Sequence, residues 1–211
     1  KIMAYSVDFI SRRMYDIYFK DLQSGEILKD TIKNTSGGFA WANDGKTIFY
    51  TRKDEQTLRS NQVFKHIVGT NSKEDELIFT EEDEAFILNV YRSKSKKYII
   101  IGSYSTLSTE YRMVSADHPG DEFKIFEPRQ RNHEYSIEHR GNEFYIITNL
   151  KEAKNFRLMK CSLQFTNYSH WKEIIPNRED ILLEGVEIFD HFMVLTERKK
   201  GLTQFRVLNE K

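Results

Sequence analysis

The residues of this sequence that could do covalent chemistry are the serine of Ser36-Gly37-Gly38, a single cysteine and six histidines. A hydrolase nucleophile elbow has the pattern Gly-x-Ser-x-Gly on a turn between a strand and a helix. Ser36 has neither the preceding glycine nor a following helix, so we interpret the segment as a loop that leads into a strand at Phe39. A phosphate-binding loop and a dinucleotide fingerprint are also missing. The sequence therefore predicts a chain without catalytic residues.

The cysteine and the histidines indicate structural roles. Cys161 lies in the alternating apolar segment Phe156–Leu163, which favours a buried, unreactive thiol. His133 and His139 are in phase on this kind of segment, which leaves a metal site open as a minor alternative. The six histidines are scattered singly, at His66, His118, His133, His139, His170 and His191. None has the i, i+4 partner of a helical zinc motif, so we expect neither a metal nor a cofactor.

Two charged features could bind a partner. The acidic runs Glu74–Glu76 and Glu81–Glu84 bracket one predicted strand, and solvated loops beside an edge strand explain them more simply than a cation site. The loop from Arg52 to Arg59 is longer and more polar than a hairpin requires. Such loops on a rigid β-scaffold often make contacts, and a tolerated insertion is an equal alternative.

The elements that must position these residues are short strands, because long helical periodicity is absent. The Asp-Gly step of Asn43-Asp44-Gly45 supplies the positive φ that a tight hairpin needs. The expected strands are Ile2–Asp8, Tyr15–Lys20, Gly38–Ala42, Thr47–Arg52, Gln62–Val68, Glu76–Thr80, Phe86–Tyr91, Lys97–Ser103, Tyr111–Ala116, Phe123–Phe126, Tyr135–His139, Glu143–Thr148, Phe156–Ser162, Trp171–Ile175, Ile188–Phe189, Phe192–Glu197 and Thr203–Leu208.

The strands repeat with a fixed period. First strands of successive units begin near Phe39, Phe86, Tyr135 and Leu183, a spacing of about 47 to 49 residues, and four-stranded propeller blades have about 40 to 50. The sequence therefore predicts an all-β fold, a β-propeller of four-stranded antiparallel blades that forms an incomplete arc of about 4–5 blades. The blade-like units are expected at residues 1–35, 36–83, 84–130, 131–179 and 180–211. A β-sandwich with long connections is the alternative.

The composition excludes some classes of partner. The 211 residues contain 32 basic and 32 acidic side chains, so no net charge draws the chain to nucleic acid or to a membrane surface. No run approaches the roughly 18 apolar residues of a membrane span. A signal peptide is not visible, and the first residue is Lys1. We expect no nucleic-acid and no membrane partner.

Short segments along the whole chain carry a second signal. They are Asp8–Arg13, Phe39–Asp44, Phe64–His66 with Gly69-Thr70, Ser108–Arg112, Arg129 with His133–Ser136, Lys154–Phe156, Leu183–Gly185, Glu197-Arg198 and Gly201–Thr203. In this order they resemble the propeller of the oligopeptidase B (protease II) branch of the prolyl oligopeptidase family of serine peptidases.

The resemblance implies a fold and an activity for the whole protein. Members of this family are cytosolic or periplasmic, and a seven-bladed propeller caps an α/β-hydrolase domain and limits access to short peptides. Oligopeptidase B cleaves after Arg or Lys. The catalytic Ser, Asp and His of the family lie in the hydrolase domain and match no residue here. The chain is therefore expected to be part of the cap, to gate substrate access, and to contact a C-terminal catalytic domain and oligopeptide substrates.

Charged side chains of the cap would then contact the catalytic domain or line the path of the substrate. The candidates are Arg52, Glu55, Arg59, Glu110, Arg112 and Arg129. Ion pairing within the propeller is the alternative for each. The rival to the whole interpretation is a stand-alone β-propeller that serves as a protein-interaction module. An enzyme with its site in a propeller tunnel is disfavoured, because the inner strands are aliphatic and aromatic. An open arc would expose two blade faces, so the isolated chain is expected to self-associate.

Overall fold

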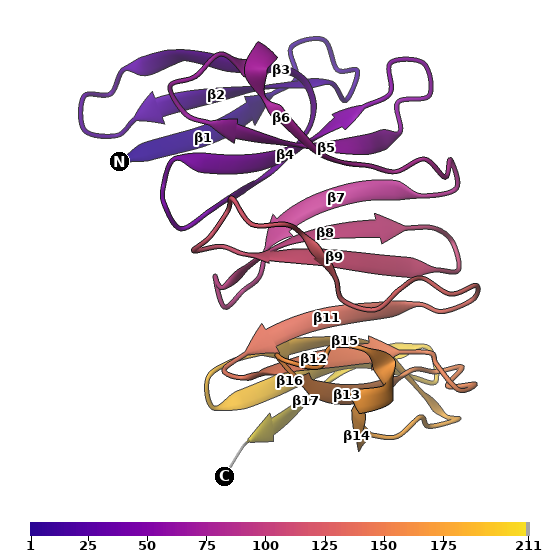
Figure 1. Cartoon of the computed structure of the whole chain (residues 1–211). Coiled ribbons are helices and arrows are strands. Elements are labelled where there is room, and N and C mark those ends of the chain that lie inside the picture. Colours follow the sequence, from indigo (N-terminus) through magenta and orange to yellow (C-terminus); the bar gives the residue numbers. More distant parts are fainter. Residues whose placement is uncertain (210–211) are drawn as a thin grey trace. The chain divides into compact units, whose positions relative to one another are not determined.

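The computed structural model describes residues 1–209, and its regular elements are antiparallel strands, joined by turns and loops, with two short 3₁₀ turns (Figure 1). The last two residues of the predicted unit 180–211 lie outside the described residues. The chain forms two compact units, the first of residues 1–105 and 111–124, the second of residues 106–110 and 125–211. The two 3₁₀ turns, η1 (Ser72–Glu74) and η2 (Tyr168–His170), are too short to cross a membrane. The prediction of an all-β chain is confirmed.

The strands form four sheets, which we name A to D. Sheet A has the order β1-β2-β3-β4-β5-β6, sheet B β10-β9-β8-β7, sheet C β11-β12-β13-β14 and sheet D β15-β16-β17. Their bounds are β1 Ile2–Val7, β2 Tyr15–Asp21, β3 Ile27–Trp41, β4 Thr47–Lys53, β5 Ser60–Ile67, β6 Glu76–Thr80, β7 Ile87–Arg92, β8 Tyr98–Tyr104, β9 Thr109–Ser115, β10 Lys124–Ile125, β11 Tyr135–Arg140, β12 Glu143–Thr148, β13 Arg157–Ser162, β14 Lys172–Ile175, β15 Ile181–Ile188, β16 Phe192–Lys199 and β17 Leu202–Asn209. Neighbouring strands follow one another in sequence, which is the meander of a propeller blade.

The hairpin between β3 and β4 forms where the sequence predicts it. Gly45 has a φ of 65°, and the Asp44 carboxylate accepts backbone hydrogen bonds of 2.9 Å from Lys46 and Thr47. Burial acts to raise the pKa of Asp44, but these bonds and one from the Thr47 hydroxyl outweigh it and hold the pKa below its ordinary value. The side chain of Asp44 therefore stabilises the turn in which it lies.

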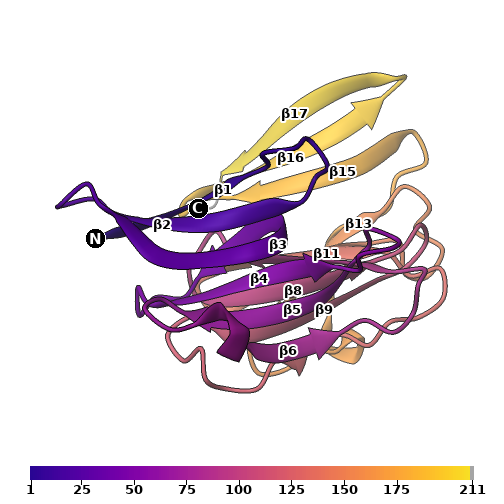
Figure 2. The same cartoon turned by 90° about the horizontal axis from the view of Figure 1, so that it is seen from above.

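Strand β3 (Ile27–Trp41) differs from the prediction, which left its first eleven residues out. Its first half pairs with β2, where Ile32 lies opposite Ile17, and its second half pairs with β4, where Phe39 lies opposite Tyr50. Figure 2 shows β1 and β2 on one side of β3 and β4 to β6 on the other. A single strand therefore runs across the predicted boundary between residues 35 and 36. Positive φ values at Asn34 and Gly37 and three register shifts obscure the alternation in sequence.

Strand β15 also differs from the prediction. It begins at Ile181, close to the start of a first strand that the repeat indicated near Leu183, whereas the strand bounds expected from the alternation were Ile188–Phe189. The register shifts between Leu183 and Gly185, and this bulge breaks the alternation. Phe189 lies in the turn, where its N–H donates to the Phe192 carbonyl at 2.9 Å.

The core follows the predicted inner strands. Strands β4, β8 and β12 are buried along most of their length, as continuous apolar runs predict. In the first unit one cluster combines side chains from β3 to β5 with others from β7 to β9, and its buried members are Ala40, Phe49, Val63, Leu88, Val90, Ile99, Ile101, Val114 and Ala116. In the second unit Tyr145, Ile147 and Leu158 of sheet C pack against Leu183, Met193 and Leu195 of sheet D. Packing of sheet against sheet is thus the main source of stability.

A buried polar network ties η1 to strands β4 and β5. His66 Nδ1 lies 2.7 Å from Asp75 Oδ1, and the Tyr50 hydroxyl donates to Asp75 Oδ2 at 2.8 Å. The side chains of His66 and Asp75 are 0% and 2% exposed, so the interpretation of the run Glu74–Glu76 as a solvated loop is wrong for Asp75. The His66 ring also stacks on Phe19. His66 therefore has a structural role, which is the role expected from the sequence for the isolated histidines.

Candidate functional site

The groups that could act as nucleophiles are occupied or buried. The Ser36 hydroxyl lies in strand β3 and hydrogen-bonds the Thr51 hydroxyl. Cys161 is buried, and burial raises the pKa of its thiol to about 12, with Glu143 adding to the shift. Burial lowers the pKa of His133, whose Nε2 lies 2.9 Å from the Thr148 hydroxyl. Within residues 1–209, no group of three or more His, Cys, Asp or Glu side chains could hold a metal ion.

Two of the six charged candidates, Arg52 and Glu55, line one groove of about 640 Å³ in the first unit. We call it the basic groove, because Lys33, Lys53 and Lys73 also line it. Its other lining residues are Thr31, Asn34, Asn71 and Ser72. Four cations and one carboxylate give the groove a positive charge, which suits an acidic partner surface and opposes a cationic one.

The cations of the basic groove are held from different elements. The guanidinium of Arg52 lies over the Phe64 ring, with 4.4 Å between Cζ and the ring centroid, which fixes the side chain by a cation–π contact. Lys53 Nζ donates to the Arg13 carbonyl at 2.5 Å. Glu55 is exposed, and no ion pair joins it to another described residue. It is therefore the candidate with the fewest ties to its own unit.

Arg59 has a role inside the first unit. Its Nη1 donates to the carbonyls of Glu81, Asp83 and Phe86 at 3.2, 3.1 and 2.9 Å. These bonds fasten the segment between β6 and β7 to the start of β5. The loop that ends at Arg59 is itself closed by Asp54, whose carboxylate accepts from the backbone of Thr57 at 2.7 Å. The predicted polar loop is thus an ordered turn.

Arg112 packs on an aromatic ring of the first unit. Its Cζ lies 4.0 Å from the centroid of Phe79, and both residues line a pocket of about 420 Å³ with Glu76, Asp121 and Glu122. A charge reversal at Arg112 would therefore remove a packing contact of β9 as well as a charge.

Glu110 and Arg129 form a pair in the second unit. Glu110 is 4% exposed, and its carboxylate accepts from the Arg129 backbone N–H at 2.9 Å and from Arg129 Nη2 at 3.4 Å. The structure thus brings together Arg52 with Glu55, and Glu110 with Arg129. Arg59 and Arg112 each stand apart from those pairs.

Sequence reasoning missed Lys33 and Lys73 of the basic groove, whereas Lys53 lies in the polar loop from Arg52 to Arg59 that it had singled out. Lys33 lies on the part of β3 that was not predicted as a strand, and Lys73 lies in η1. The available signal was the unassigned stretch between the strands Tyr15–Lys20 and Gly38–Ala42, which is long for a loop in a compact domain.

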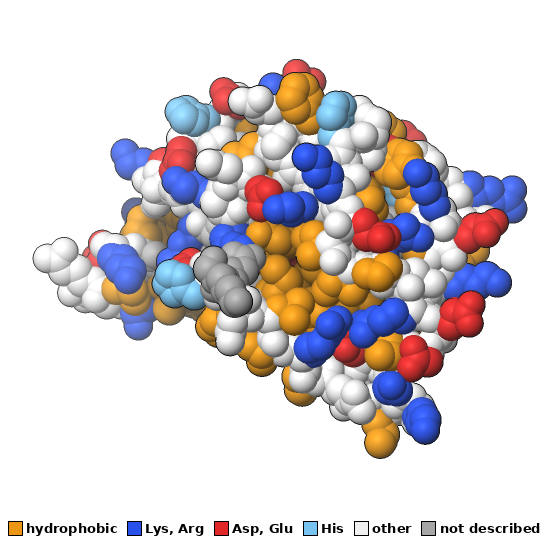
Figure 3. Space-filling view, turned by 90° about the horizontal axis from the view of Figure 1, so that it is seen from below, with side chains coloured by type: hydrophobic (Ala, Val, Ile, Leu, Met, Phe, Trp, Pro, Cys, Tyr) orange, Lys and Arg blue, Asp and Glu red, His pale blue; other side chains and the backbone are white. Residues whose placement is uncertain are grey.

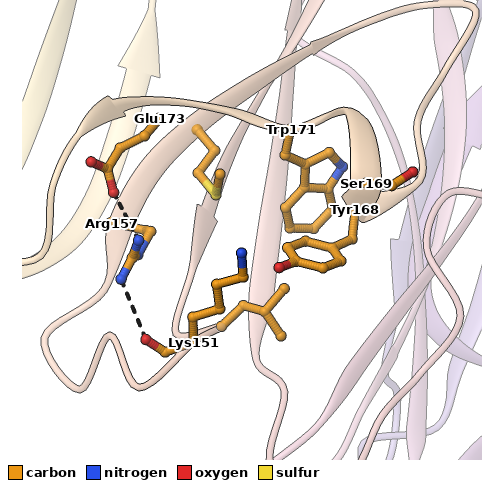
Figure 4. Close-up of a pocket in the computed structure, with 8 residues that line it drawn as sticks. Lys151, Arg157, Tyr168, Ser169, Trp171 and Glu173 are labelled. Atoms are coloured by element: carbon orange, nitrogen blue, oxygen red, sulfur yellow. Dashed lines mark hydrogen bonds and ion pairs between the residues drawn. The ribbon is translucent and has the colours of Figure 1, made fainter.

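A second pocket, of about 480 Å³, lies in the second unit and was also missed. Its aromatic members, Tyr168 and Trp171, are in edge-to-face contact with 5.9 Å between ring centroids. Figure 4 shows the Lys151 side chain between this aromatic pair and the ion pair of Arg157 with Glu173. Trp171 is largely buried, and one part of its ring faces the pocket.

Sheet D exposes apolar side chains. In the register of β16 with β17, Val194 lies opposite Val207 and Thr196 opposite Phe205, so Phe205 and Val207 lie on the same face. Phe205 is 72% exposed and Val207 57%. Figure 3 shows hydrophobic side chains gathered in the middle of one face of the molecule, with charged side chains around them. Exposed apolar faces of this kind are typical of interaction surfaces.

Comparison with known proteins supplies the context for this geometry. The family model described as the N-terminal β-propeller domain of prolyl oligopeptidase matches residues 1–211. Dipeptidyl aminopeptidase BI of Pseudoxanthomonas mexicana is 39% identical over 208 residues, which are 99% of this chain and 29% of that protein. Protease 2 of Moraxella lacunata is 33% identical over 198 residues, 93% of this chain and 28% of that protein.

Solved structures agree with the family model. The structure of oligopeptidase B from Leishmania major has a TM-score of 0.92 and 26% sequence identity, and the match covers 100% of this chain and 29% of that chain. The chain thus spans less than a third of the length of the proteins that it matches. The prediction of a β-propeller class is confirmed.

Proposed function

Because this chain belongs to the family of prolyl oligopeptidase N-terminal β-propeller domains, we propose that it caps the catalytic domain of a serine peptidase. The match of the family model over residues 1–211 is the observation that carries the proposal. The chain supplies no activated nucleophile in its described part, so hydrolysis belongs to residues outside it. Its own role is to restrict which substrates reach the catalytic groups.

The proposed substrates are short peptides cleaved after Arg or Lys. The likeness to protease 2 and to oligopeptidase B supports this choice. Release of N-terminal dipeptides is the second candidate, because the relative that is 39% identical is named a dipeptidyl aminopeptidase. The rest of the protein decides between the two, since specificity depends on groups that touch the substrate.

The cap can select substrates by size because sheets with packed cores are stiff. A rigid cap with a narrow opening admits an extended peptide and excludes a folded domain, and motion of the cap against the catalytic domain would open and close the site. The basic groove would repel an Arg or Lys side chain, so we assign it to contact with an acidic surface of the catalytic domain. The exposed face of sheet D would be covered by further sheet in the whole protein or, in the isolated chain, by self-association.

The proposal is tested with a panel of fluorogenic substrates on the whole protein that carries this chain. We expect cleavage after Arg and Lys in short peptides. We expect no cleavage when the same peptide sequence is part of a folded protein. Preferred release of unblocked N-terminal dipeptides would favour the second candidate. Absence of all peptidase activity would contradict both. We also propose a cytoplasmic or periplasmic location, which fractionation of the producing cells would test.

Among the charged candidates, Glu55 offers the cleanest test of contact with the catalytic domain. Its side chain is exposed, so Glu55→Lys is expected to leave the thermal midpoint within about 1 °C of the parent. If Glu55 pairs with a single cation within that otherwise acidic surface of the catalytic domain, charge reversal lowers kcat/KM by about 3- to 10-fold through misplacement of the cap. Steady-state kinetics on a short Arg substrate measures the change.

The matched control is Glu26→Lys, which makes the same change of charge on an exposed turn outside the groove. Parent-like kinetics are expected for that variant. If Glu55→Lys and Glu26→Lys give the same kcat/KM, Glu55 is not an interdomain contact.

A further inference from the structure

The pocket of about 480 Å³ in the second unit lies apart from the six charged candidates and has no role in the proposed function. We call it the aromatic pocket. Strands β13 and β14 supply Arg157, Met159 and Glu173, and the η2 turn supplies Tyr168. It is therefore built on two paired strands of sheet C and on a turn that packs beside them.

One side of the aromatic pocket is apolar and rigid. Trp171 is 7% exposed, and its Nε1–H donates to the Thr166 carbonyl at 2.6 Å, which fixes the indole ring. Tyr168 stands against it edge to face, and its backbone N–H donates to the buried Glu127 carboxylate at 2.7 Å. Leu150 and Met159 complete this lining. Such a wall takes a large apolar or aromatic side chain.

The other side carries one uncompensated positive charge. Arg157 Nη1 pairs with Glu173 at 2.8 Å, so these two charges cancel. Lys151 Nζ lies 5.3 Å from the centroid of the Tyr168 ring, and no carboxylate of residues 1–209 forms an ion pair with it. Lys151 and Glu152 are consecutive left-handed residues, with φ values of 53° and 59°, which set the direction of the Lys151 side chain.

We propose that the aromatic pocket binds the C-terminal residue of a short peptide, with its carboxylate on Lys151 and its large apolar side chain on Tyr168 and Trp171. The ammonium and the aromatic ring are close together, so their ligand must carry an anion and an apolar group a few ångströms apart. The α-carboxylate and the side chain of one amino acid meet this condition. A charge-assisted hydrogen bond from Lys151 would orient the carboxylate.

The charge of the pocket favours a carboxylate over a phosphate. Lys151 is its single uncompensated cation among the described lining residues, and Glu173 would repel a second negative charge. Every unblocked peptide substrate carries a free C-terminus, as does the fragment cut from that end, so under the proposed function the whole protein would meet this class of ligand. The proposal does not depend on which bond the peptidase cleaves.

The test is isothermal titration calorimetry of the whole protein with N-acetyl-phenylalanine. We expect saturable binding, and we expect it to weaken about fivefold or more in the Lys151→Gln variant. Lys151 is exposed, so this substitution leaves the fold intact. The matched control is Lys154→Gln, an exposed lysine of the same loop that does not line the pocket, and it should bind like the parent.

Three ligands separate the parts of the proposal. N-acetyl-phenylalanine amide lacks the carboxylate, and N-acetyl-alanine lacks the large side chain, and both should bind the parent about fivefold or more weakly. A capped Glu-Phe peptide without a free C-terminus should bind weakly as well. The proposal would be overturned if N-acetyl-phenylalanine did not bind, or if it bound the Lys151→Gln variant as tightly as the parent. It would also be overturned if the amide or the capped peptide bound the parent as tightly as N-acetyl-phenylalanine does.

Discussion

Replacement of Gly37 by alanine is expected to lower the free energy of unfolding by about 3 kcal/mol. Gly37 has a φ of 92°, a backbone conformation that an L-residue adopts only with strain. An added Cβ would also lie 2.8 Å from Cγ of the Tyr15 ring. The Thr35 hydroxyl fixes this approach, because it donates to the Tyr15 carbonyl and accepts from the Gly37 N–H. Urea denaturation followed by circular dichroism measures the loss.

Gly25→Ala is the matched control for Gly37→Ala. Gly25 also has a positive φ, of 78°, but an added Cβ would meet no atom within 4 Å. Its substitution should cost about 1 kcal/mol, the strain alone. Equal losses in the two variants would contradict the close packing of Tyr15 against β3.

Replacement of Asp75 by alanine is the second change with a large expected effect. The carboxylate accepts from the Tyr50 hydroxyl and pairs with His66 Nδ1, and the side chains of His66 and Asp75 are almost completely buried. Removal of one partner leaves a buried histidine and a buried hydroxyl without their acceptor, so we expect a loss of about 3 kcal/mol. The change in the urea midpoint, at unchanged slope, measures it.

The control for this variant is Asp121→Ala, an exposed aspartate of the same unit. It should change stability by less than about 0.5 kcal/mol. A loss that small in Asp75→Ala would show that the network does not stabilise the fold.

Much of the fold could be predicted from the sequence, because two-residue alternation and continuous apolar runs reflect burial directly. Strands β6 and β12 have the predicted bounds, Glu76–Thr80 and Glu143–Thr148. Strand β3 could not be predicted in full, because Asn34 and Gly37 shift its register while hydrogen bonds to β2 and β4 hold it extended. The length of β3 therefore depends on pairing with β2 and β4, and the sequence alone does not show this pairing.

The site was harder to predict than the fold. Residue type and loop position identify the charged candidates, but they do not show what each side chain contacts. Arg59 donates hydrogen bonds to backbone carbonyls, and Glu110 is buried and accepts hydrogen bonds from Arg129. The basic groove and the aromatic pocket arise from residues far apart in sequence, such as Lys33 with Lys73, and Lys151 with Trp171. The resemblance to the prolyl oligopeptidase family, carried by short segments between the strands, is confirmed.

The most direct test of the central claim is reaction of the whole protein with a fluorophosphonate probe, followed by mass spectrometry of the digested product. The claim is that this chain caps a serine peptidase and holds none of its catalytic groups. We predict one labelled serine, outside the 211 residues described by this sequence, and loss of peptidase activity in step with labelling. A labelled serine within these residues, or a protein that takes no label, would contradict it.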